Sequence, residues 1–168
     1  EDFARDAKAA GVDALIIVDL PPEEDLPLRI HAEKVGLDII RLLTPTTDEA
    51  RLSTALDGAG GIHYYVSVTG VTRGATASTA YLTTHLDMIR SKTKIPVVVG
   101  FGIKTPNDAQ EMSKLADGVV VGSAIVEKIK DIAVNDPNLD PVLGLVKSLS
   151  GALSDAADID SRVKSGTV

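Results

Sequence analysis

Short runs of apolar, mostly β-branched residues recur along the chain, and a segment with helical periodicity follows each run. The runs predict five strands: Ala14–Asp19, Asp38–Leu43, Ile62–Ser67, Ile95–Val99 and Gly118–Val121. Successive runs begin 23 or 24 residues apart, except for one step of 33 residues after the third run. Such a step accommodates a strand, a short loop and a helix, which is the βα unit of a parallel sheet. The pattern therefore predicts a series of five βα units.

Residues typical of helix ends stand between these runs. Thr46 precedes Glu49 by three residues, the spacing of a capping box, and Thr105 stands before a proline at a predicted helix start. Gly11 and Gly36 lie just after predicted helices, where a left-handed backbone conformation ends a helix. We expect helices to begin and end at these positions.

Five βα units in series leave two α/β architectures open, a doubly wound open sheet and part of a (β/α)8 TIM barrel. The short and regular units favour the barrel. Five strands cannot close an eight-stranded barrel, so we expect three further units before Glu1, where the sequence begins inside an amphipathic helix without an initiator Met. Residues 1–168 are predicted to be one domain, the C-terminal five-eighths of the barrel, with a closing helix over Val142–Leu149 and a frayed tail from about residue 155.

The amino-acid composition argues against nucleic acid and membranes as binding partners. The 168 residues carry 24 acidic and 17 basic side chains, a formal net charge of −7, with no Trp and only 3% aromatic residues. An acidic chain poor in aromatic side chains lacks the features that bind nucleic acid. The apolar runs are far shorter than the roughly 20 residues of a membrane-spanning helix. The absence of Cys excludes disulfides and thiolate zinc sites and fits a reducing cytosol. We therefore expect a cytoplasmic protein with no nucleic-acid or membrane partner.

Three loops that follow predicted strands are rich in glycine: residues 69–74, 100–103 and 122–125. Ligands of parallel α/β folds bind at the carboxyl ends of the strands, where these loops lie. Glycine permits close backbone approach, and a helix start presents unpaired amides to an anion. The last two loops follow successive strands and predict a phosphate site, although a glycine after a strand can also serve only to form a tight turn.

Few side chains are candidates for acid–base chemistry. Asp19 is expected at the end of the first strand, either at the mouth of the barrel or as the cap of the following helix. The Tyr64 hydroxyl could reach the mouth or be satisfied in the core, and His63 must face the opposite side of the sheet by strand alternation. No His or carboxylate pair has the spacing of metal ligands, so no metal site is expected.

Five segments occur in an order and spacing typical of one family: Val18–Glu24, Leu43–Thr47, Tyr64–Thr72, Val99–Ile103 and Val121–Val126. Together they resemble the tryptophan synthase alpha chain over nearly the whole sequence. The third segment, combined with Gly-Phe-Gly-Ile, is the most specific part of this resemblance. Generic phosphate-binding barrels share only the glycine-containing loops.

The resemblance implies a TIM-barrel lyase of tryptophan biosynthesis that cleaves indole-3-glycerol phosphate to indole and glyceraldehyde 3-phosphate. It implies no cofactor in this chain, and a pyridoxal-phosphate-dependent beta chain as partner in a complex of two alpha and two beta chains. The reaction is a retro-aldol cleavage, which needs an acid and a base. In the family these are a Glu at the end of the second strand and an Asp on the loop after it. Both would precede Glu1, so the chain alone is expected to be inactive.

Site residues follow from the matching motifs. The resemblance implies that Tyr64 is the active-site tyrosine and that Asp19 is the aspartate of the family's fourth strand. It also implies that Gly102, Gly122 and Ser123 bind the substrate phosphate.

One motif departs from the family pattern. The family reads Gly-Val-Thr-Gly, whereas here Arg73 separates Thr72 from Gly74. Either the phosphate-binding glycine amide has moved by one place to Gly74, or residues of a mobile lid loop are missing at Thr72–Arg73. The loop from Thr69 to Ser78 is predicted to be this lid.

Two other functions remain open. One is a different phosphate-sugar barrel, similar to indole-glycerol-phosphate synthase. Such an enzyme requires a lysine in a strand near the mouth of the barrel, and none of the predicted strands contains one. The other is a non-catalytic half-barrel that only binds phosphate. A strand ending in Glu before Glu1, followed by an Asp, would decide for the lyase.

Overall fold

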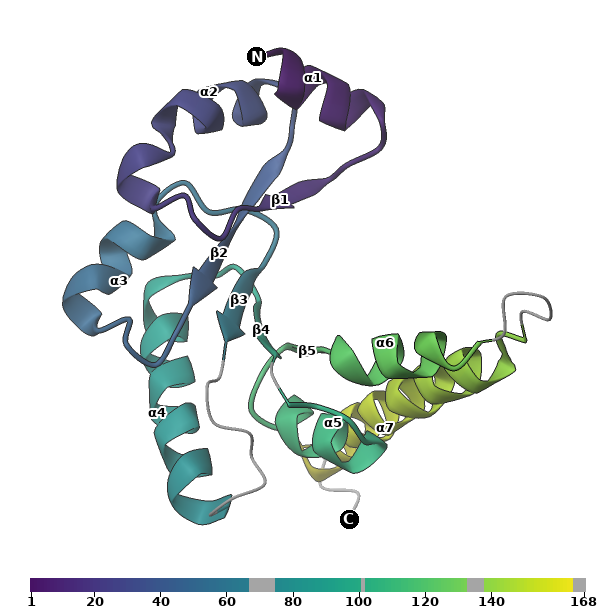
Figure 1. Cartoon of the computed structure of the whole chain (residues 1–168). Helices are drawn as coiled ribbons and strands as arrows, with labels where there is room; N and C mark the ends of the chain where they lie inside the picture. Colours follow the sequence, from purple (N-terminus) through teal and green to yellow (C-terminus); the bar gives the residue numbers. More distant parts are fainter. Residues whose placement is uncertain (67–74, 101, 133–137, 165–168) are drawn as a thin grey trace.

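The computed structural model describes residues 1–66, 75–100, 102–132 and 138–164, and Figure 1 shows the chain as helices that alternate with strands of one sheet. The strands are β1 (Ala14–Ile16), β2 (Asp38–Leu43), β3 (His63–Val66), β4 (Val97–Gly100) and β5 (Gly118–Val120). The helices are α1 (Asp2–Ala9), α2 (Leu26–Lys34), α3 (Glu49–Leu56), α4 (Ala75–Lys92), α5 (Pro106–Ser113), α6 (Ser123–Lys130) and α7 (Asp140–Lys164), with a 3₁₀ turn, η1 (Pro22–Glu24), before α2.

All strand pairs are parallel, and the strands lie in chain order, β1-β2-β3-β4-β5. A doubly wound sheet reverses its strand order at a switch point, whereas a barrel adds each strand beside the one before it. The sequential order therefore confirms the barrel type of arrangement, and all carboxyl ends of the strands lie at one edge of the sheet.

The predicted first strand is too long. β1 ends at Ile16, where its pairing with Ile40 of β2 ends. The chain then turns, with the Leu20 amide donating to the Ile17 carbonyl at 3.4 Å. Two consecutive prolines follow, and proline has no amide hydrogen for ladder bonding. Asp19 consequently lies in a turn beyond β1 and not at the end of the strand.

Three of the predicted helix boundaries are confirmed. Thr105 and Asp108 form a capping box, with the Thr105 hydroxyl accepting from the Asp108 amide at 3.2 Å and the Asp108 carboxylate accepting from the Thr105 amide at 2.9 Å. Gly11 and Gly36 follow α1 and α2 with φ of +89° and +70°. Both glycines have the left-handed conformation that a side chain would strain.

Two other boundaries differ from the prediction. The cap of α3 is Asp48, which accepts from the Arg51 amide at 2.8 Å, and the predicted cap Thr46 instead places its hydroxyl 2.8 Å from that of Thr44. The closing helix α7 extends to Lys164, well past Leu149 and over much of the predicted tail. The single-domain assignment and the fraying of the tail stay predictions.

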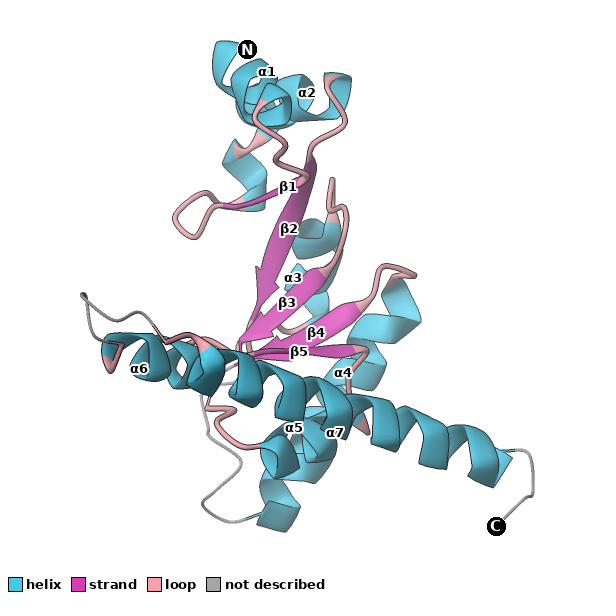
Figure 2. Ribbon diagram, turned by 90° about the vertical axis from the view of Figure 1, so that its right-hand side faces the viewer, coloured by secondary structure: helices cyan, strands magenta, loops and turns pink. Residues whose placement is uncertain are grey.

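Strand alternation gives the sheet two different faces. Side chains on one face pack against the helices in a core that contains Leu43, Tyr65, Val97 and Val99, all at most 1% exposed. A second buried cluster joins Ala4 of α1 and Ala32 of α2 to Ile39 of β2. Figures 1 and 2 show the helices arranged around the sheet. The main hydrophobic core thus lies between the sheet and its helices.

The opposite face of the sheet is less covered. Its residues Leu42, Tyr64 and Val98 are only half-buried, and Ile16 at the β1 edge is 49% exposed. In a complete barrel this face would line the interior. In the described part of the chain it remains an apolar surface with access to solvent.

No helix within the described residues is both long enough and apolar enough to cross a bilayer.

His63 faces the helical layer, as strand alternation requires. Its side chain is fully buried, and its Nε2 lies 3.3 Å from the Thr93 hydroxyl. Burial, followed by the nearby Arg41 guanidinium, lowers the pKa of His63 below its ordinary value of 6.5.

This lowered pKa predicts a pH dependence of stability. Below about pH 6.5 the unfolded chain binds a proton at this position more readily than the folded chain. The free energy of unfolding is therefore expected to fall as the pH drops from 7 towards the lowered pKa. His63→Gln should flatten this slope in denaturant titrations at several pH values. His31→Gln on α2 is the matched control and should keep the slope; equal slopes in all three proteins would contradict the assignment.

Candidate functional site

The centre of the candidate site is the contact between Tyr64 of β3 and Gly100 of β4. A Cβ atom on Gly100 would overlap the Tyr64 hydroxyl and come within 2.7 Å of its Cζ. Tyr64 pairs with Val98 and Gly100 with Val66, so the tyrosine ring leans along the neighbouring strand towards the carboxyl edge. Because the ring occupies the place of a side chain at Gly100, the glycine determines where the tyrosine lies.

The two glycine-containing loops follow adjacent strands. Gly100 pairs with Val120, so Gly102 and Gly122 each lie two residues beyond a matched pair at the same edge of the sheet. Gly102 has φ of +78°, which only glycine adopts without strain. Gly122 is the N-cap residue of α6, and a Cβ placed there would meet no atom of the described residues within 4 Å. As far as the described part of the chain extends, the backbone beside Gly122 is thus open to a ligand.

The start of α6 has the properties of an anion site. The Gly122 carbonyl accepts the amides of Ile125 and Val126 at 3.0 and 3.1 Å, so the amides of Ser123 and Ala124 precede the first bond of the helix. No side chain of a described residue caps this helix. These amides, which have no hydrogen-bond partner within the described part of the chain, and the positive end of the helix dipole favour a negatively charged group.

The helix after β4 differs in this respect. The amides of Lys104 and Thr105 both donate to the Asp108 carboxylate, at 3.1 and 2.9 Å. Burial alone would raise the pKa of Asp108, but these amide hydrogen bonds and that of the Thr105 hydroxyl lower it. Asp108 therefore already occupies the start of α5 with a negative charge, and α6 remains the better place for an anion.

Asp19 lies apart from these groups. It is exposed in the turn after β1, and within the described residues it forms no hydrogen bond or ion pair and caps no helix. β1 and β5 are the two edge strands of the sheet. The structure therefore brings Tyr64, Gly102, Gly122 and Ser123 to three neighbouring strand ends and leaves Asp19 at the other end of the row. Thr72, Arg73 and Gly74 lie outside the described residues, so their roles and the lid stay predictions. The predicted loop is too long at its end, however, because residues 75–78 belong to α4.

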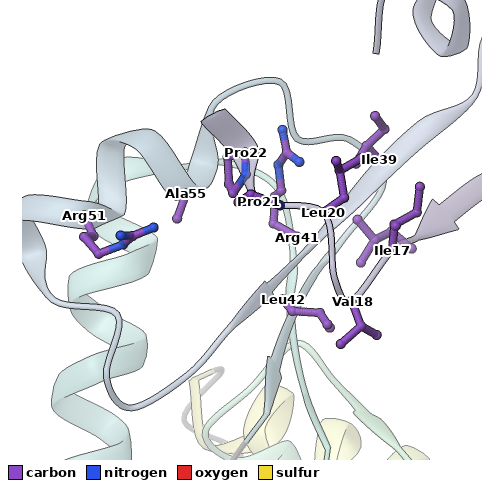
Figure 3. Close-up of a pocket in the computed structure, with 11 residues that line it drawn as sticks. Ile17, Val18, Leu20, Pro21, Pro22, Ile39, Arg41, Leu42, Arg51 and Ala55 are labelled. Carbon is purple, nitrogen blue, oxygen red and sulfur yellow. The ribbon is translucent and has the colours of Figure 1, made fainter. Parts of the chain in front are cut away.

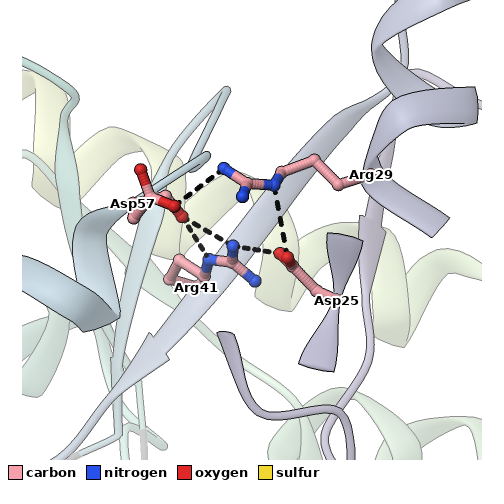
Figure 4. A network of polar contacts seen from close by, with 4 residues as sticks. All are labelled: Asp25, Arg29, Arg41 and Asp57. Atoms are coloured by element: carbon pink, nitrogen blue, oxygen red, sulfur yellow. Dashed lines mark hydrogen bonds and ion pairs between the residues drawn. The ribbon is translucent and has the colours of Figure 1, made fainter. Parts of the chain in front are cut away.

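A charged cluster behind β2 was not predicted. Asp25 is fully buried at the start of α2 and pairs with Arg41 of β2 and with Arg29 of α2, while Asp57 after α3 contacts both arginines (Figure 4). The sequence holds one signal for it: Arg41 interrupts an otherwise apolar run, Ile39 to Leu43. A buried arginine needs a buried acceptor, although its position in the chain cannot be read from the sequence.

A pocket of about 230 Å³ lies between the loop after β1 and strand β2. Ile17, Val18 and Leu20 line it from the loop, and Figure 3 shows them facing Leu42 and Arg41 of β2. The pocket opens because the loop leaves β2 after Ile16. Nine of its eleven lining residues are apolar, and Arg41 and Arg51 add charged groups to the wall. Among the described residues, no group of three His, Cys, Asp or Glu side chains could hold a metal ion.

Comparisons with known proteins agree on one family. The family model described as tryptophan synthase alpha chain matches residues 1–156. A tryptophan synthase alpha chain from Zymomonas mobilis is 51% identical over 158 residues, which cover 93% of this chain and 57% of that protein. The tryptophan synthase alpha subunit of Campylobacter jejuni superposes with a TM-score of 0.79 at 33% identity. The match covers 88% of this chain and 58% of the Campylobacter chain.

A tryptophan synthase alpha chain from Legionella pneumophila gives a TM-score of 0.77 at 35% identity, covering 91% of this chain and 56% of that one. The chain thus spans a little more than half the length of the relatives that it matches. The residues common to the match include the described parts of the site, from β3 to the start of α6.

The contact at Gly100 predicts a coupled pair of substitutions. Gly100→Ala should displace the Tyr64 ring and lower the free energy of unfolding by about 1–3 kcal/mol, the usual cost of overpacking. Adding Tyr64→Ala should remove the clash, so the combined loss should be smaller than the sum of the two single losses. Denaturant unfolding of the four proteins measures the coupling. Gly118→Ala, whose Cβ would meet Val98 at 3.1 Å, is the control and should show no coupling to position 64. Strict additivity at positions 100 and 64 would contradict the contact.

Proposed function

Because this chain belongs to the tryptophan synthase alpha chain family, we propose that it forms the phosphate-binding part of a lyase of tryptophan biosynthesis. The proposed reaction is the retro-aldol cleavage of indole-3-glycerol phosphate to indole and glyceraldehyde 3-phosphate. The observation that carries it is the arrangement of Tyr64 over Gly100 beside the two glycine-containing loops. These groups share the carboxyl edge of three adjacent strands, where barrel enzymes bind substrate.

The phosphate end of the substrate would bind at α6. A phosphate dianion on the amides near Gly122 and Ser123 would be stabilised by local dipoles, which act at short range despite the net charge of −7. Gly102 on the neighbouring loop would close the cradle from the other side. This site would fix the phosphate end of the substrate. The other end would then be directed along the less covered face of the sheet, the open face, which carries Leu42, Tyr64 and Val98.

The apolar end would lie on the half-buried face of the sheet. Leu42, Tyr64 and Val98 offer it an apolar wall, and the Tyr64 hydroxyl adds a polar atom at the carboxyl edge. Retro-aldol cleavage then needs a base for the glycerol hydroxyl and an acid for the indole carbon. We propose that two carboxylates from βα units preceding β1 supply these, with Asp19 as a supporting group at the mouth.

The family name also suggests the partner. An alpha chain is one chain of a larger enzyme, and we propose a pyridoxal-phosphate-dependent beta chain that receives the indole. The alpha chain itself would need no cofactor, because protonation and deprotonation suffice for its reaction. A cytoplasmic location follows from this pathway.

The second reading, a different phosphate-sugar barrel, predicts a lysine in a strand near the mouth. None of the strands β1 to β5 contains a lysine. The third reading, a phosphate-binding half-barrel without catalysis, shares the site at α6 and differs only in the missing carboxylates. Activity of the chain joined to its preceding units separates it from the lyase.

The phosphate site is tested at Gly122. Gly122→Val should lower the affinity for inorganic phosphate by at least tenfold, because its branched side chain would fill the open space beside the amides of α6. The fold should persist, since a Cβ at this position meets none of the described atoms within 4 Å. Calorimetric titration with phosphate measures the affinity, and circular dichroism checks the fold. Gly122→Ala should give a smaller loss; equal affinity in all three proteins would remove this site.

The open face is tested with the chain itself. Residues 1–168 should self-associate, bind an apolar dye and fail to cleave indole-3-glycerol phosphate, because the face that includes Ile16 and Leu42 is exposed and the proposed carboxylates are absent. Addition of the preceding βα units should reverse all three properties. A monomeric chain of 168 residues with cleavage activity would contradict the proposal.

A further inference from the structure

The loop of residues 17–24, between β1 and α2, lacks the two usual supports of a loop at a sheet edge. Its pairing with β2 ends at Ile16, so no ladder hydrogen bonds hold it beyond that residue. Beneath it lies the pocket of about 230 Å³, so it is not closely packed against β2 either. Its backbone hydrogen bonds are local turns, from the Leu20 amide to the Ile17 carbonyl and from the Glu24 amide to the Pro21 carbonyl.

The downstream end of this loop is anchored by charge. Asp25 follows η1 directly, and its side chain is fully buried. One carboxylate oxygen accepts from Arg41 Nη2, and the other lies 3.2 Å from Arg29 Nε. A buried carboxylate is stable only where cations compensate its charge. The two guanidinium groups therefore determine where Asp25 lies.

Arg41 connects this anchor to the rest of the fold. Its Nε and Nη2 donate to the Asp57 carbonyl at 3.2 and 2.6 Å, and its side chain is 6% exposed. The Asp57 carboxylate lies 2.9 Å from Arg29 Nη1. One guanidinium thus joins the centre of β2, the end of α3 and the end of the loop, a geometry that the planar fork of arginine allows and a lysine ammonium does not.

We propose that Arg41 is a positioning residue, which holds Asp25 and thereby fixes the loop of residues 17–24 over the pocket beside β2. Arg41 alternates with Leu42 along β2, so it faces the helices and not the open face where the proposed substrate would lie. Its effect on a ligand is therefore indirect, through the loop that carries Val18 and Asp19. The part of the proposal that concerns catalysis rests on the proposed function.

Hydrogen exchange of the full 168-residue chain tests the anchor without reference to activity. In Arg41→Lys and in Asp25→Asn, the amides of residues 18–20 and 23–25 should exchange about tenfold faster or more, while those of β3 and β4 keep their rates. Arg51→Ala is the matched control. Arg51 also pairs with this loop, at Glu23, but across 3.2 Å between side chains that are 62% and 48% exposed, so its loss should leave the loop rates unchanged.

The same variants are then assayed in the protein that joins this chain to its preceding βα units. Arg41→Lys should lower kcat/KM for indole-3-glycerol phosphate by about tenfold without shifting the protein's pH optimum, and Arg41→Met should lower it further. Unchanged loop exchange in both Arg41→Lys and Asp25→Asn, or faster exchange spread evenly over the whole chain, would overturn the proposal. If the unsubstituted protein does not cleave this substrate, the proposed function fails, and the exchange result still decides the anchor.

Discussion

Parallel pairing of the strands in chain order is the constraint on which the rest of the structure depends. Each βα unit places its helix on the same face of the sheet and its carboxyl end at the same edge. The helices therefore cover one face, where Tyr65 and Val99 are buried, and leave Tyr64 and Val98 of the same strands half-buried on the other. The same constraint brings the loops at Gly102 and Gly122 side by side, although 20 residues separate them in the sequence. The order of strand pairing alone therefore determines where the candidate site lies, at the carboxyl edge of the sheet.

Local patterns were enough to predict much of this arrangement. β2 has the predicted bounds, and Thr105, Gly11 and Gly36 end or begin helices as their chemistry requires. The errors have physical causes. The apolar run through Val18 indicates a strand, but strand pairing ends at Ile16, five residues before the first local breaker, Pro21. Thr46 has the spacing of a cap, but Asp48 lies nearer to the helix start and accepts the amide bond instead.

The charged cluster around Arg41 could not have been predicted in the same way. Its members come from β2, α2 and the ends of η1 and α3, and only folding brings them together. The apolar run around Arg41 indicates that a buried counter-charge must exist, but it does not identify Asp25. The contact between Tyr64 and Gly100 could not be predicted either. Strand register, and not sequence spacing, decides which glycine lies under the ring. Pairwise tertiary contacts of this kind are what sequence periodicity leaves undetermined.

Two polar features of the fold have different roles: the buried charged cluster around Arg41 and the start of α6 at the carboxyl edge of the sheet. On the helical side, opposite charges are buried together, so Arg41 and Asp25 fix the backbone while adding no net charge to the site. At the carboxyl edge, no described side chain caps the start of α6, whereas Thr105 and Asp108 together cap α5. A carboxylate cap at α6 would satisfy the helix but repel a phosphate, so an open helix start suits a binding site better than a capped one. This distinction matters in a chain with a net charge of −7, because the backbone dipoles of an open helix start attract an anion at short range.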